Sequence, residues 1–200
     1  MTMTQDRSGS PSASARRSMI DCQLRTSGVN EPWILEAMAS LAREDFVPPA
    51  MRESAYIDRA IALGDGRMLA APVVHGKMLA EAEPNKKDNA LLIGNAEGYL
   101  AALLRPLVGS LDAIAPETVR DSEGEGTYSL IVIDGAIEEI PENLAVRLAD
   151  HGRLVTGWVK RGVTCLAVGR RAGGEIALLP VAEIGIPILP EFSAPKRWSF

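Results

Sequence analysis

The chain has 200 residues, a hydrophobic content of 46% and a formal net charge of −5, which together suit one globular domain with a sizeable core. The acidic balance argues against a nucleic-acid partner, because nucleic-acid-binding domains normally present a basic face. No apolar run approaches the roughly 20 residues of a membrane span, and the polar start lacks the apolar core of a secretory signal. Cys22 and Cys165 match no metal-binding or redox spacing, so we expect buried or idle thiols in a reducing cytoplasm, and no metal.

The first 18 residues are rich in serine and carry Arg16-Arg17. They offer little apolar surface to bury, which predicts a disordered tail over residues 1–18. Residues 19–49 then follow a helical pattern, with Asn30 as a candidate N-cap and Pro32 in the first turn. Apolar side chains recur there at helical spacing, at Ile34, Leu35, Met38 and Leu41. The run Phe46-Val47-Pro48-Pro49 ends this helix.

The same region carries a long motif. Its parts, in order, are Gln23-Leu24-Arg25, Gly28-Val29, Pro32, Leu35, Ala37-Met38, Arg43-Glu44 and Phe46-Val47-Pro48. In order and spacing, the motif resembles the N-terminal region of protein-L-isoaspartate O-methyltransferases. The resemblance covers residues 19–200 with one large gap. It implies an α/β fold of the Rossmann-like, S-adenosylmethionine (SAM)-dependent methyltransferase class, with a mostly parallel sheet between helices, and repair of isoaspartate by methylation of its α-carboxylate.

The resemblance also implies a domain organisation. Residues 19–200 would form a single methyltransferase-like domain, with a helical and substrate-loop region over 19–76 and a Rossmann-like core over 77–200. The stretch Met68–Gly76 looks like the family's substrate loop, in which a serine two residues before a proline touches the substrate carboxylate. Ala70 stands at that position, so no catalytic residue is assigned, and the substrate-loop candidates are Ala71, Pro72 and His75. A lone histidine in such a loop is more often structural or solvated. A helix is predicted from Lys77 to Glu83.

A strand, a glycine turn and a helix follow one another between residues 90 and 104. Ala90–Ile93 has the length and composition of a buried strand. The turn Gly94–Gly98 precedes the helix formers of Tyr99–Leu104. This order opens nucleotide-binding α/β units, in which the free N–H groups of the helix N-terminus face an anion or a polar cofactor.

The turn also resembles the family's SAM motif, of which Gly94, Gly98 and Tyr99 are kept. An acidic residue, the middle glycine and a threonine are replaced by Leu92, Ala96 and Glu97. Glu97 would stand at the helix N-terminus, where its charge suits the helix dipole, so we interpret it as a capping residue or as a substitute for a ligand's negative end. The resemblance implies cofactor contacts at Gly94, Asn95, Glu97 and Gly98.

The next predicted strand is Leu111–Ile114. In such folds, a carboxylate about 20 residues after the first glycine binds the ribose hydroxyls, but the aligned residue is Ala115. Glu117, two positions on, is the substitute candidate. Only thirteen residues, 115–127, then separate this strand from the next, Ser129–Ile133. A mean helix of ~11 residues and a mean strand of ~5 do not fit there together, so we predict that one edge strand and its helix are deleted.

The remainder follows the family pattern more closely. Asp134 and Gly135 resemble the start of its second motif, which makes them cofactor-contact candidates. Helix, turn and strand are predicted around Pro141, His151 and Arg153–Thr156. A further strand over Leu166–Arg171, the turn Gly173-Gly174 and a strand over Ile176–Leu179 form a hairpin. The aromatic end, Trp198-Ser199-Phe200, is expected to be docked, because two large rings would otherwise be exposed.

Two hypotheses follow from this pattern. In one, the chain is a non-catalytic relative with SAM binding weakened or lost, a pseudoenzyme retained as a binding or assembly module. In the other, it is an active protein-L-isoaspartate(D-aspartate) O-methyltransferase that uses SAM and acts on a protein or peptide in protein repair. Methyl transfer depends mostly on positioning two substrates, and four binding positions are altered at once, which favours the first hypothesis. These positions are Ala70, Leu92, Ala96 and Ala115.

A nicotinamide-dependent Rossmann enzyme is a third, weaker interpretation, because the second-strand carboxylate is absent for that cofactor as well. For partners, we expect the sheet edge left by the predicted deletion to be covered by a second copy of the chain, which gives a homodimer, or by residues 115–127, since a bare sheet edge tends to be paired or covered. No nucleic acid and no membrane are expected as partners.

Overall fold

The computed structural model describes residues 11–64, 66–120, 126–172 and 175–194. These residues form two compact units, one up to Gly76 and the other from Lys77 onwards. Whether residues 19–200 act as a single domain stays a prediction. Within the described ranges, no helix has both the length and the apolar character that crossing a bilayer requires.

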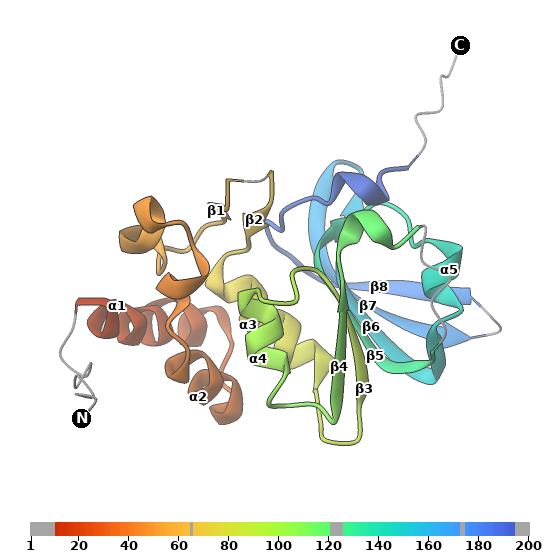
Figure 1. Cartoon of the computed structure of the whole chain (residues 1–200), viewed down its shortest axis with the longest axis horizontal. Helices are drawn as coiled ribbons and strands as arrows, with labels where there is room; N and C mark the ends of the chain where they lie inside the picture. Colours follow the sequence, from red (N-terminus) through yellow and green to blue (C-terminus); the bar gives the residue numbers. More distant parts are fainter. Residues whose placement is uncertain (1–10, 65, 121–125, 173–174, 195–200) are drawn as a thin grey trace, which may run out of the picture. The chain divides into compact units, whose positions relative to one another are not determined.

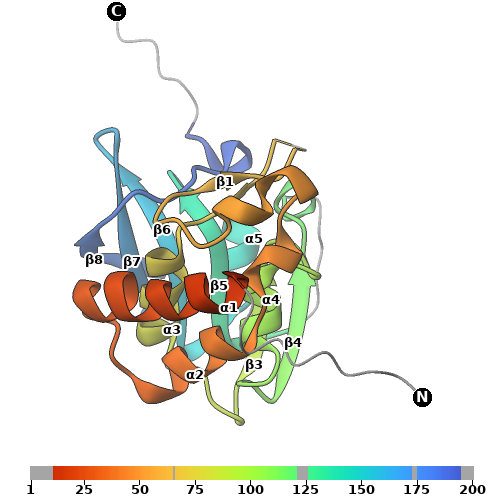
Figure 2. The same ribbon diagram turned by 90° about the vertical axis from the view of Figure 1, so that its left-hand side faces the viewer.

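The first unit is built from short helices around a small apolar core. Met19, Leu24, Ile34 and Met38 are fully buried in it. Its elements are helices α1 (Pro11–Met19) and α2 (Pro32–Ser40), the helical turns η2 (Ile20–Leu24), η3 (Arg25–Ser27), η4 (Arg43–Phe46) and η5 (Pro49–Ser54), and the antiparallel pair β1 (Ile61–Ala62) and β2 (Met68–Leu69) (Figure 2).

Helix α1 corrects the prediction of a disordered tail for residues 11–18; residues 1–10 lie outside the described ranges. Arg16 explains the difference, because its guanidinium donates hydrogen bonds to the Tyr56 hydroxyl at 2.8 Å and to the Ala39 carbonyl at 3.0 Å. It also faces the Glu44 carboxylate at 3.5 Å. The tail prediction counted apolar side chains and missed this polar docking, whose partners are 23 to 40 residues away in the sequence.

Three helix boundaries also differ from the sequence analysis. Glu31, not Asn30, is the N-cap of α2, and it makes no side-chain capping hydrogen bond. The helix ends at Ser40, so Leu41 is its C-cap and not part of its apolar stripe. Helix α3 (Pro72–Ala82) begins five residues before the predicted start at Lys77, because proline suits the first turn of a helix.

The second unit contains a six-stranded sheet in the order β4-β3-β5-β6-β7-β8 (Figure 1). β3, β4, β5 and β6 are parallel to their neighbours in this set, whereas β7 and β8 run antiparallel. The strand bounds are β3 (Asn89–Ile93), β4 (Ser110–Ile114), β5 (Tyr128–Ile137), β6 (Leu148–Lys160), β7 (Val163–Ala172) and β8 (Glu175–Glu183). All four strands predicted for the core are confirmed, and so is the hairpin of β7 and β8, although its turn, Gly173-Gly174, lies outside the described residues.

Helices lie on both faces of the sheet. The end of α3 and α4 (Tyr99–Leu104) lie on one face, and α5 (Glu142–Ala145) lies on the other (Figure 1). Beneath α5, the inward side chains of β3, β5 and β6 form one apolar core that includes Leu91, Ile131 and Leu154. The fold is therefore the predicted α/β arrangement, a mostly parallel sheet between helices.

β4 is an edge of this sheet in the described part of the chain. The connection from β4 to β5 holds the turn η6 (Pro116–Thr118), and its residues 121–125 lie outside the described ranges. Val119 turns inward and packs in the apolar core, and its carbonyl accepts a hydrogen bond from the Asn143 side chain. The described part of the connection is thus drawn toward α5 instead of pairing with the outer side of β4.

His151 was predicted to lie in a turn, and the structure places it inside β6, in a left-handed conformation with φ of 63°. The pairing of β5 with β6 shifts register between Tyr128–Leu148 and Leu130–Arg153, so His151 belongs to a strand irregularity. The aromatic end, Trp198–Phe200, lies outside the described residues.

Candidate cofactor and substrate sites

The carboxyl ends of three parallel strands define the candidate cofactor site. β3 ends at Ile93, β4 at Ile114, and β5 passes the same level at Ile133. From β3 the chain proceeds to β4 on one side, and β5 lies on the other side. In open α/β sheets, ligands bind in the crevice outside the strand ends at such a switch point.

The turn after β3 is closed by its own polar groups. The Gly94 N–H donates to the Ile114 carbonyl at 2.9 Å, which joins the turn to the end of β4. The Asn95 side chain accepts from the Glu97 N–H at 3.0 Å, and its carbonyl accepts from Gly98 at 2.9 Å. Two of the turn's N–H groups are therefore bonded within the turn and not directed at a ligand.

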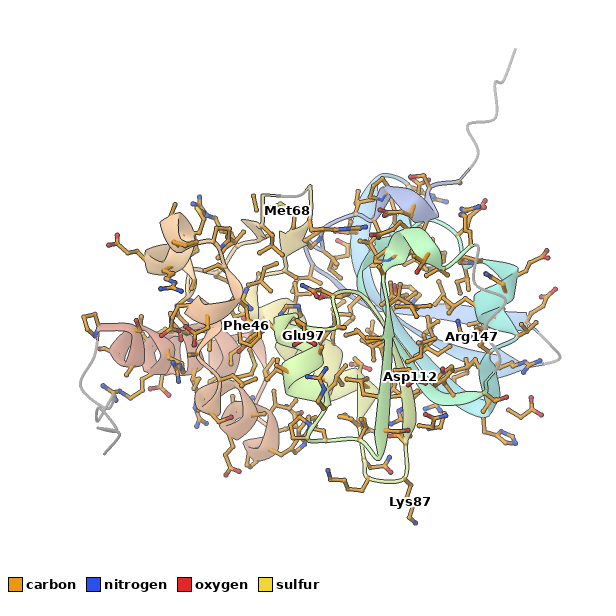
Figure 3. All side chains as sticks on the ribbon, viewed as in Figure 1. Phe46, Met68, Lys87, Glu97, Asp112 and Arg147 are labelled. Atoms are coloured by element: carbon orange, nitrogen blue, oxygen red, sulfur yellow. The ribbon has the colours of Figure 1, made fainter. Side chains whose placement is uncertain are left out.

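Ala96 and Glu97 occupy the exposed tip of this turn (Figure 3). Arg105, at the C-terminal end of α4, donates to the Ala96 carbonyl at 2.9 Å. Gly98 is the N-cap of α4, and no side chain caps this helix, so the interpretation of Glu97 as a capping residue was wrong. Sequence reasoning also missed Arg105, which holds the altered turn from a position nine residues further on.

The end of β4 offers no carboxylate to a ribose. Ala115 stands at the aligned position, and its carbonyl accepts from the Thr118 N–H at 3.0 Å and from the Thr118 hydroxyl at 2.8 Å. Glu117 is exposed in η6. The carboxylate of β4 is Asp112, which lies earlier in the strand and accepts a hydrogen bond from Tyr128 at 2.7 Å.

Asp112, Tyr128 and Arg147 form a polar cluster that the sequence analysis did not anticipate (Figure 3). The Arg147 guanidinium lies over the Tyr128 ring, 5.3 Å from its centroid. Burial, followed by the hydrogen bond to Asp112, raises the pKa of the Tyr128 hydroxyl. The cluster ties β4 to β5 across β3, so Asp112 has a structural role here.

Asp134 and Gly135 lie in β5, directly after Ile133, which pairs with the last residue of β3. A side chain at Gly94 would place its Cβ 3.1 Å from the Asp134 Cβ, so the turn after β3 approaches β5 closely. The space above Gly135 is filled by Leu189, because a Cβ added at Gly135 would lie 2.5 Å from the Leu189 Cγ. Gly135 is therefore needed for packing in this chain, and a cofactor role for it stays a prediction.

Leu189 belongs to a C-terminal segment that the sequence analysis left unassigned. Ala136 donates to the Pro187 carbonyl at 2.7 Å and accepts from the Leu189 N–H at 2.9 Å, and Ala136 forms a parallel bridge with Ile188. Since Ala136 pairs with Gly157 of β6 on its other side, residues 187–189 occupy the edge of β5 that β3 leaves after Ile93. This segment bounds the candidate cofactor site on the β5 side.

The substrate-loop candidates lie in the first unit and in α3, and all three are buried. Ala71 precedes α3, Pro72 is its first residue, and His75 is fully buried within it. Arg43, also fully buried, directs its Nη1 to the His75 Nδ1 at 3.4 Å. It donates as well to the carbonyls of Ala55, at 2.8 Å, and Ala70.

Arg43 therefore organises the stretch that resembles the substrate loop. Its place in the N-terminal motif was a signal, but no pattern in the sequence indicated its partners. In the described residues, no group of three or more His, Cys, Asp or Glu side chains is arranged to hold a metal ion. Cys22 is exposed, Cys165 is buried, and both are free thiols.

The fold defines the class of protein. The mostly parallel sheet with a glycine turn at its switch point matches solved structures of the Rossmann-like methyltransferase fold. A solved isoaspartate methyltransferase from Plasmodium falciparum, in complex with S-adenosyl-L-homocysteine, matches with a TM-score of 0.70 and 16% identity, over 90% of this chain and 98% of its own. A second solved protein-L-isoaspartate O-methyltransferase matches with a TM-score of 0.71 and 15% identity, over 89% and 67%.

Sequence comparison identifies the family. The family model for protein-L-isoaspartate(D-aspartate) O-methyltransferase matches residues 15–121. A protein-L-isoaspartate O-methyltransferase of Methanoregula boonei is 31% identical over 190 residues, which cover 82% of this chain and 88% of the relative. A homologue of the same name from Aeropyrum pernix is 34% identical, over 74% and 68%. The chain belongs to the protein-L-isoaspartate(D-aspartate) O-methyltransferase family, and the family match ends within the short connection after β4.

Proposed function

We propose that this chain is a non-catalytic member of its family, with SAM binding weakened or lost, retained as a binding or assembly module. The observation that carries the proposal is the end of β4. Ala115 offers no side-chain acceptor to a ribose, and its carbonyl already accepts two hydrogen bonds from Thr118. β4 is also a sheet edge in the described residues, so no neighbouring strand there supplies a wall beside an adenine.

The glycine turn supports the same conclusion. Ala96 adds a methyl group where the family's backbone approaches the cofactor, and Arg105 holds the Ala96 carbonyl in place. Leu92 stands where the family has an acidic residue, and it is fully buried in the sheet. A buried leucine side chain offers no hydrogen-bond acceptor. The site therefore lacks the polar contact that an acidic residue at position 92 would provide.

The substrate side is altered as well. Ala70 replaces the serine that holds the substrate carboxylate in the family, and the Ala70 carbonyl accepts a hydrogen bond from Arg43. Without the hydroxyl, the loop lacks a donor for the anion on which the reaction acts.

The magnitudes favour a large loss of cofactor affinity. A hydrogen bond lost to an uncharged ligand group costs ~0.5–1.5 kcal/mol. Two such losses, at Leu92 and Ala115, weaken binding by about fivefold to 140-fold, since 1.4 kcal/mol is a factor of ten. Together with the Ala96 methyl group and the missing wall beside the adenine, these losses move a cofactor that binds with micromolar affinity in an intact site to the millimolar range or weaker.

Thermal unfolding with 1 mM SAM tests the proposal. A pocket with a dissociation constant near 10 μM would stabilise the protein by ~2.7 kcal/mol, which is roughly 5–10 °C in the unfolding midpoint of a chain of this size. We expect a rise below about 1 °C. The variant Ala96→Gly with Ala115→Glu should recover little, because point substitutions do not restore a strand and its helix. A rise of several degrees in the unmodified protein would contradict the proposal.

An active methyltransferase is the second candidate function, because the relatives carry that name and one solved relative was found with S-adenosyl-L-homocysteine. In that case the substrate would be an isoaspartyl protein or peptide. Transfer of a labelled methyl group from SAM to an isoaspartyl peptide, above the level seen with the matching aspartyl peptide, would establish it.

As an assembly module, the chain is proposed to pair with a second copy of itself through the outer side of β4. This edge offers exposed Ser110 and Asp112, and unpaired edge strands are templates for association. Light scattering should give the mass of a dimer. A monomer at all accessible concentrations would contradict the proposal.

A further inference from the structure

An acid-rimmed hollow of about 580 Å³ opens in the second unit, beyond the carboxyl end of β5. Its apolar part consists of half-buried side chains, among which Ile140, Ile176 and Leu178 pack against the core. Its rim is acidic, with three exposed glutamates and one arginine. The lining residues are Arg120, Glu138, Glu139, Ile140, Pro141, Glu142, Trp158, Ile176 and Leu178.

The chemistry of the hollow fits a short peptide that is both basic and aromatic. Leu178 and Ile176 offer an apolar surface to a ring, and the glutamates offer carboxylates to lysine or arginine. Trp158 adds an aromatic face that attracts cations, and one cation, the Lys160 ammonium, already lies 5.1 Å from its ring centroid. Arg120 is the one basic residue among the described residues that line the hollow. Its Nε donates a hydrogen bond to the Glu191 carbonyl at 3.0 Å.

A segment of this composition follows directly in the sequence. Residues 195–200 read Pro-Lys-Arg-Trp-Ser-Phe, with two basic and two aromatic side chains in six positions. No function derived above uses them.

The point at which this segment begins is fixed at the rim of the hollow. The Ala194 N–H donates to the Glu138 carboxylate at 2.6 Å. Just before it, the Phe192 carbonyl accepts from the N–H groups of Glu138 and Glu139 at 3.1 and 3.2 Å. Four residues of extended chain span roughly 13 Å, and Glu138, which binds Ala194, lines the same hollow as Ile176 and Leu178.

We propose that residues 195–200 bind in cis in this hollow, with the Trp198 ring against Ile176 and Leu178 and with Lys196 and Arg197 against the glutamate rim. The hollow is then a binding site for a basic, aromatic peptide whose resident occupant is the chain's own end. Occupation covers apolar surface that Ile176, Leu178 and Trp158 otherwise expose. This inference does not depend on whether the protein binds SAM.

The test uses the full chain labelled with 5-fluorotryptophan. Its three fluorine resonances, from Trp33, Trp158 and Trp198, are assigned by tryptophan-to-phenylalanine variants. We expect the solvent isotope shift of Trp198 between H₂O and D₂O to be about threefold smaller than that of free 5-fluorotryptophan, because a docked ring loses most of its contact with water. A Trp198 shift equal to that of the free amino acid would overturn the proposal.

Charge reversal tests the rim. Glu139→Lys with Glu142→Lys should raise the Trp198 shift toward the free value, and adding Lys196→Glu with Arg197→Glu should restore protection. A cooperative thermal unfolding transition of the full chain reports that the second unit still folds, because Trp33 lies in the other unit and its resonance reports only on that unit. Glu81→Lys with Glu183→Lys is the matched control, because it reverses two exposed charges outside the hollow and should leave Trp198 protected.

If the rim variant fails to fold, the tail-side reversal Lys196→Glu with Arg197→Glu alone tests the same pairing without changing the hollow, and it should expose Trp198. A rim reversal that leaves Trp198 protected would contradict the role of the glutamates. Protection of Trp198 that falls on dilution would show that the occupant comes from a second copy, and it would overturn binding in cis.

Discussion

The ion pair of Asp88 and Arg153 should carry more of the stability of the second unit than any exposed ion pair of the chain. Two guanidinium nitrogens of Arg153 face the two carboxylate oxygens, with Nη2–Oδ2 at 2.6 Å and Nη1–Oδ1 at 3.1 Å. The Asp88 side chain is 5% exposed and that of Arg153 is 14% exposed. Arg153 also donates to the carbonyls of Ala82 and Glu83, at the end of α3.

Asp88 has further donors. Its carboxylate accepts from the Ser129 hydroxyl at 2.7 Å, and from the Asn85 backbone at 2.9 Å and side chain at 2.8 Å. The pair therefore connects the loop before β3 with β5, β6 and the end of α3. No motif in the sequence includes Asp88 and Arg153 as a pair. They are 65 positions apart, so no local pattern indicates that they interact.

Removal of one partner should be costly. Arg153→Met keeps much of the side-chain volume but leaves the Asp88 carboxylate buried without its counter-ion, and such a change costs about 3–5 kcal/mol. At ~2–4 °C per kcal/mol, the unfolding midpoint should fall by roughly 6–20 °C. The double variant with Asp88→Asn should lose less than the sum of the two single variants, because the residues interact directly.

The pair also predicts a pH dependence. Burial alone would raise the pKa of Asp88, but the hydrogen bonds from Arg153, Ser129 and Asn85 and the Arg153 charge lower it. A folded-state pKa below the unfolded value, about 3.9, contributes stability above that value, and the contribution is lost as the pH falls through the folded pKa. The stability difference between wild type and Asp88→Asn should therefore be constant from pH 7 to about 5 and shrink below about pH 4.

Urea unfolding of wild type, Arg153→Met and Asp88→Asn at several pH values measures these effects. Asp150→Asn is the matched control, because the Asp150 side chain is 89% exposed and lies 4.0 Å from Arg171. It should change stability by no more than about 1 kcal/mol. A stability cost below 1 kcal/mol for Arg153→Met would refute the reasoning. So would a stability difference between wild type and Asp88→Asn that does not change with pH.

Two further predictions concern elements that the sequence analysis missed. Arg16→Met should lower the unfolding midpoint by roughly 3–12 °C, because a hydrogen bond to a charged group contributes ~1.5–3 kcal/mol. Arg25 is exposed, so Arg25→Met is the control, and equal effects would show that α1 is not docked through Arg16. Gly135→Ala should destabilise by ~1–3 kcal/mol in denaturant unfolding, because its Cβ overpacks against Leu189. Adding Leu189→Ala should recover part of that loss, and strictly additive costs would contradict the contact.

Elements that depend on a local pattern were predictable. Ala90–Ile93 is an apolar run bounded by a glycine turn, and a strand buried on both faces requires such a run. The hairpin of β7 and β8 was predictable for a similar reason, because two strand-like runs flank a glycine pair. The edge position of β4 in the described residues was predicted from the family resemblance together with segment length, since thirteen residues do not hold both a helix and a strand.

Elements that depend on distant partners were not predictable in this way. Residues 187–189 pair with β5 because β3 ends at Ile93 and leaves the edge of β5 open. No residue within the segment indicates this pairing. Helix α1 forms a polar docking contact with Tyr56 and Glu44, which a count of apolar side chains does not detect.

At the candidate site, the residue types were predictable from the sequence, but their contacts were not. The residue types at Ala70, Ala96 and Ala115 were available from the sequence, and so was the chemistry they lack. Their surroundings were not: Arg43 bonds to the Ala70 carbonyl, Arg105 to that of Ala96, and Thr118 to that of Ala115. Such bonds depend on where the backbone turns, so only the structure provides them.

Calorimetric titration with SAM tests the central claim, the loss of cofactor binding, most directly. With the unmodified protein, we expect no saturable heat up to 1 mM SAM, because the turn after β3 and the end of β4 lack the polar contacts that would hold it. Saturable one-to-one binding with a dissociation constant of about 10 μM, equivalent to ~−6.8 kcal/mol, would contradict the account and favour the active enzyme.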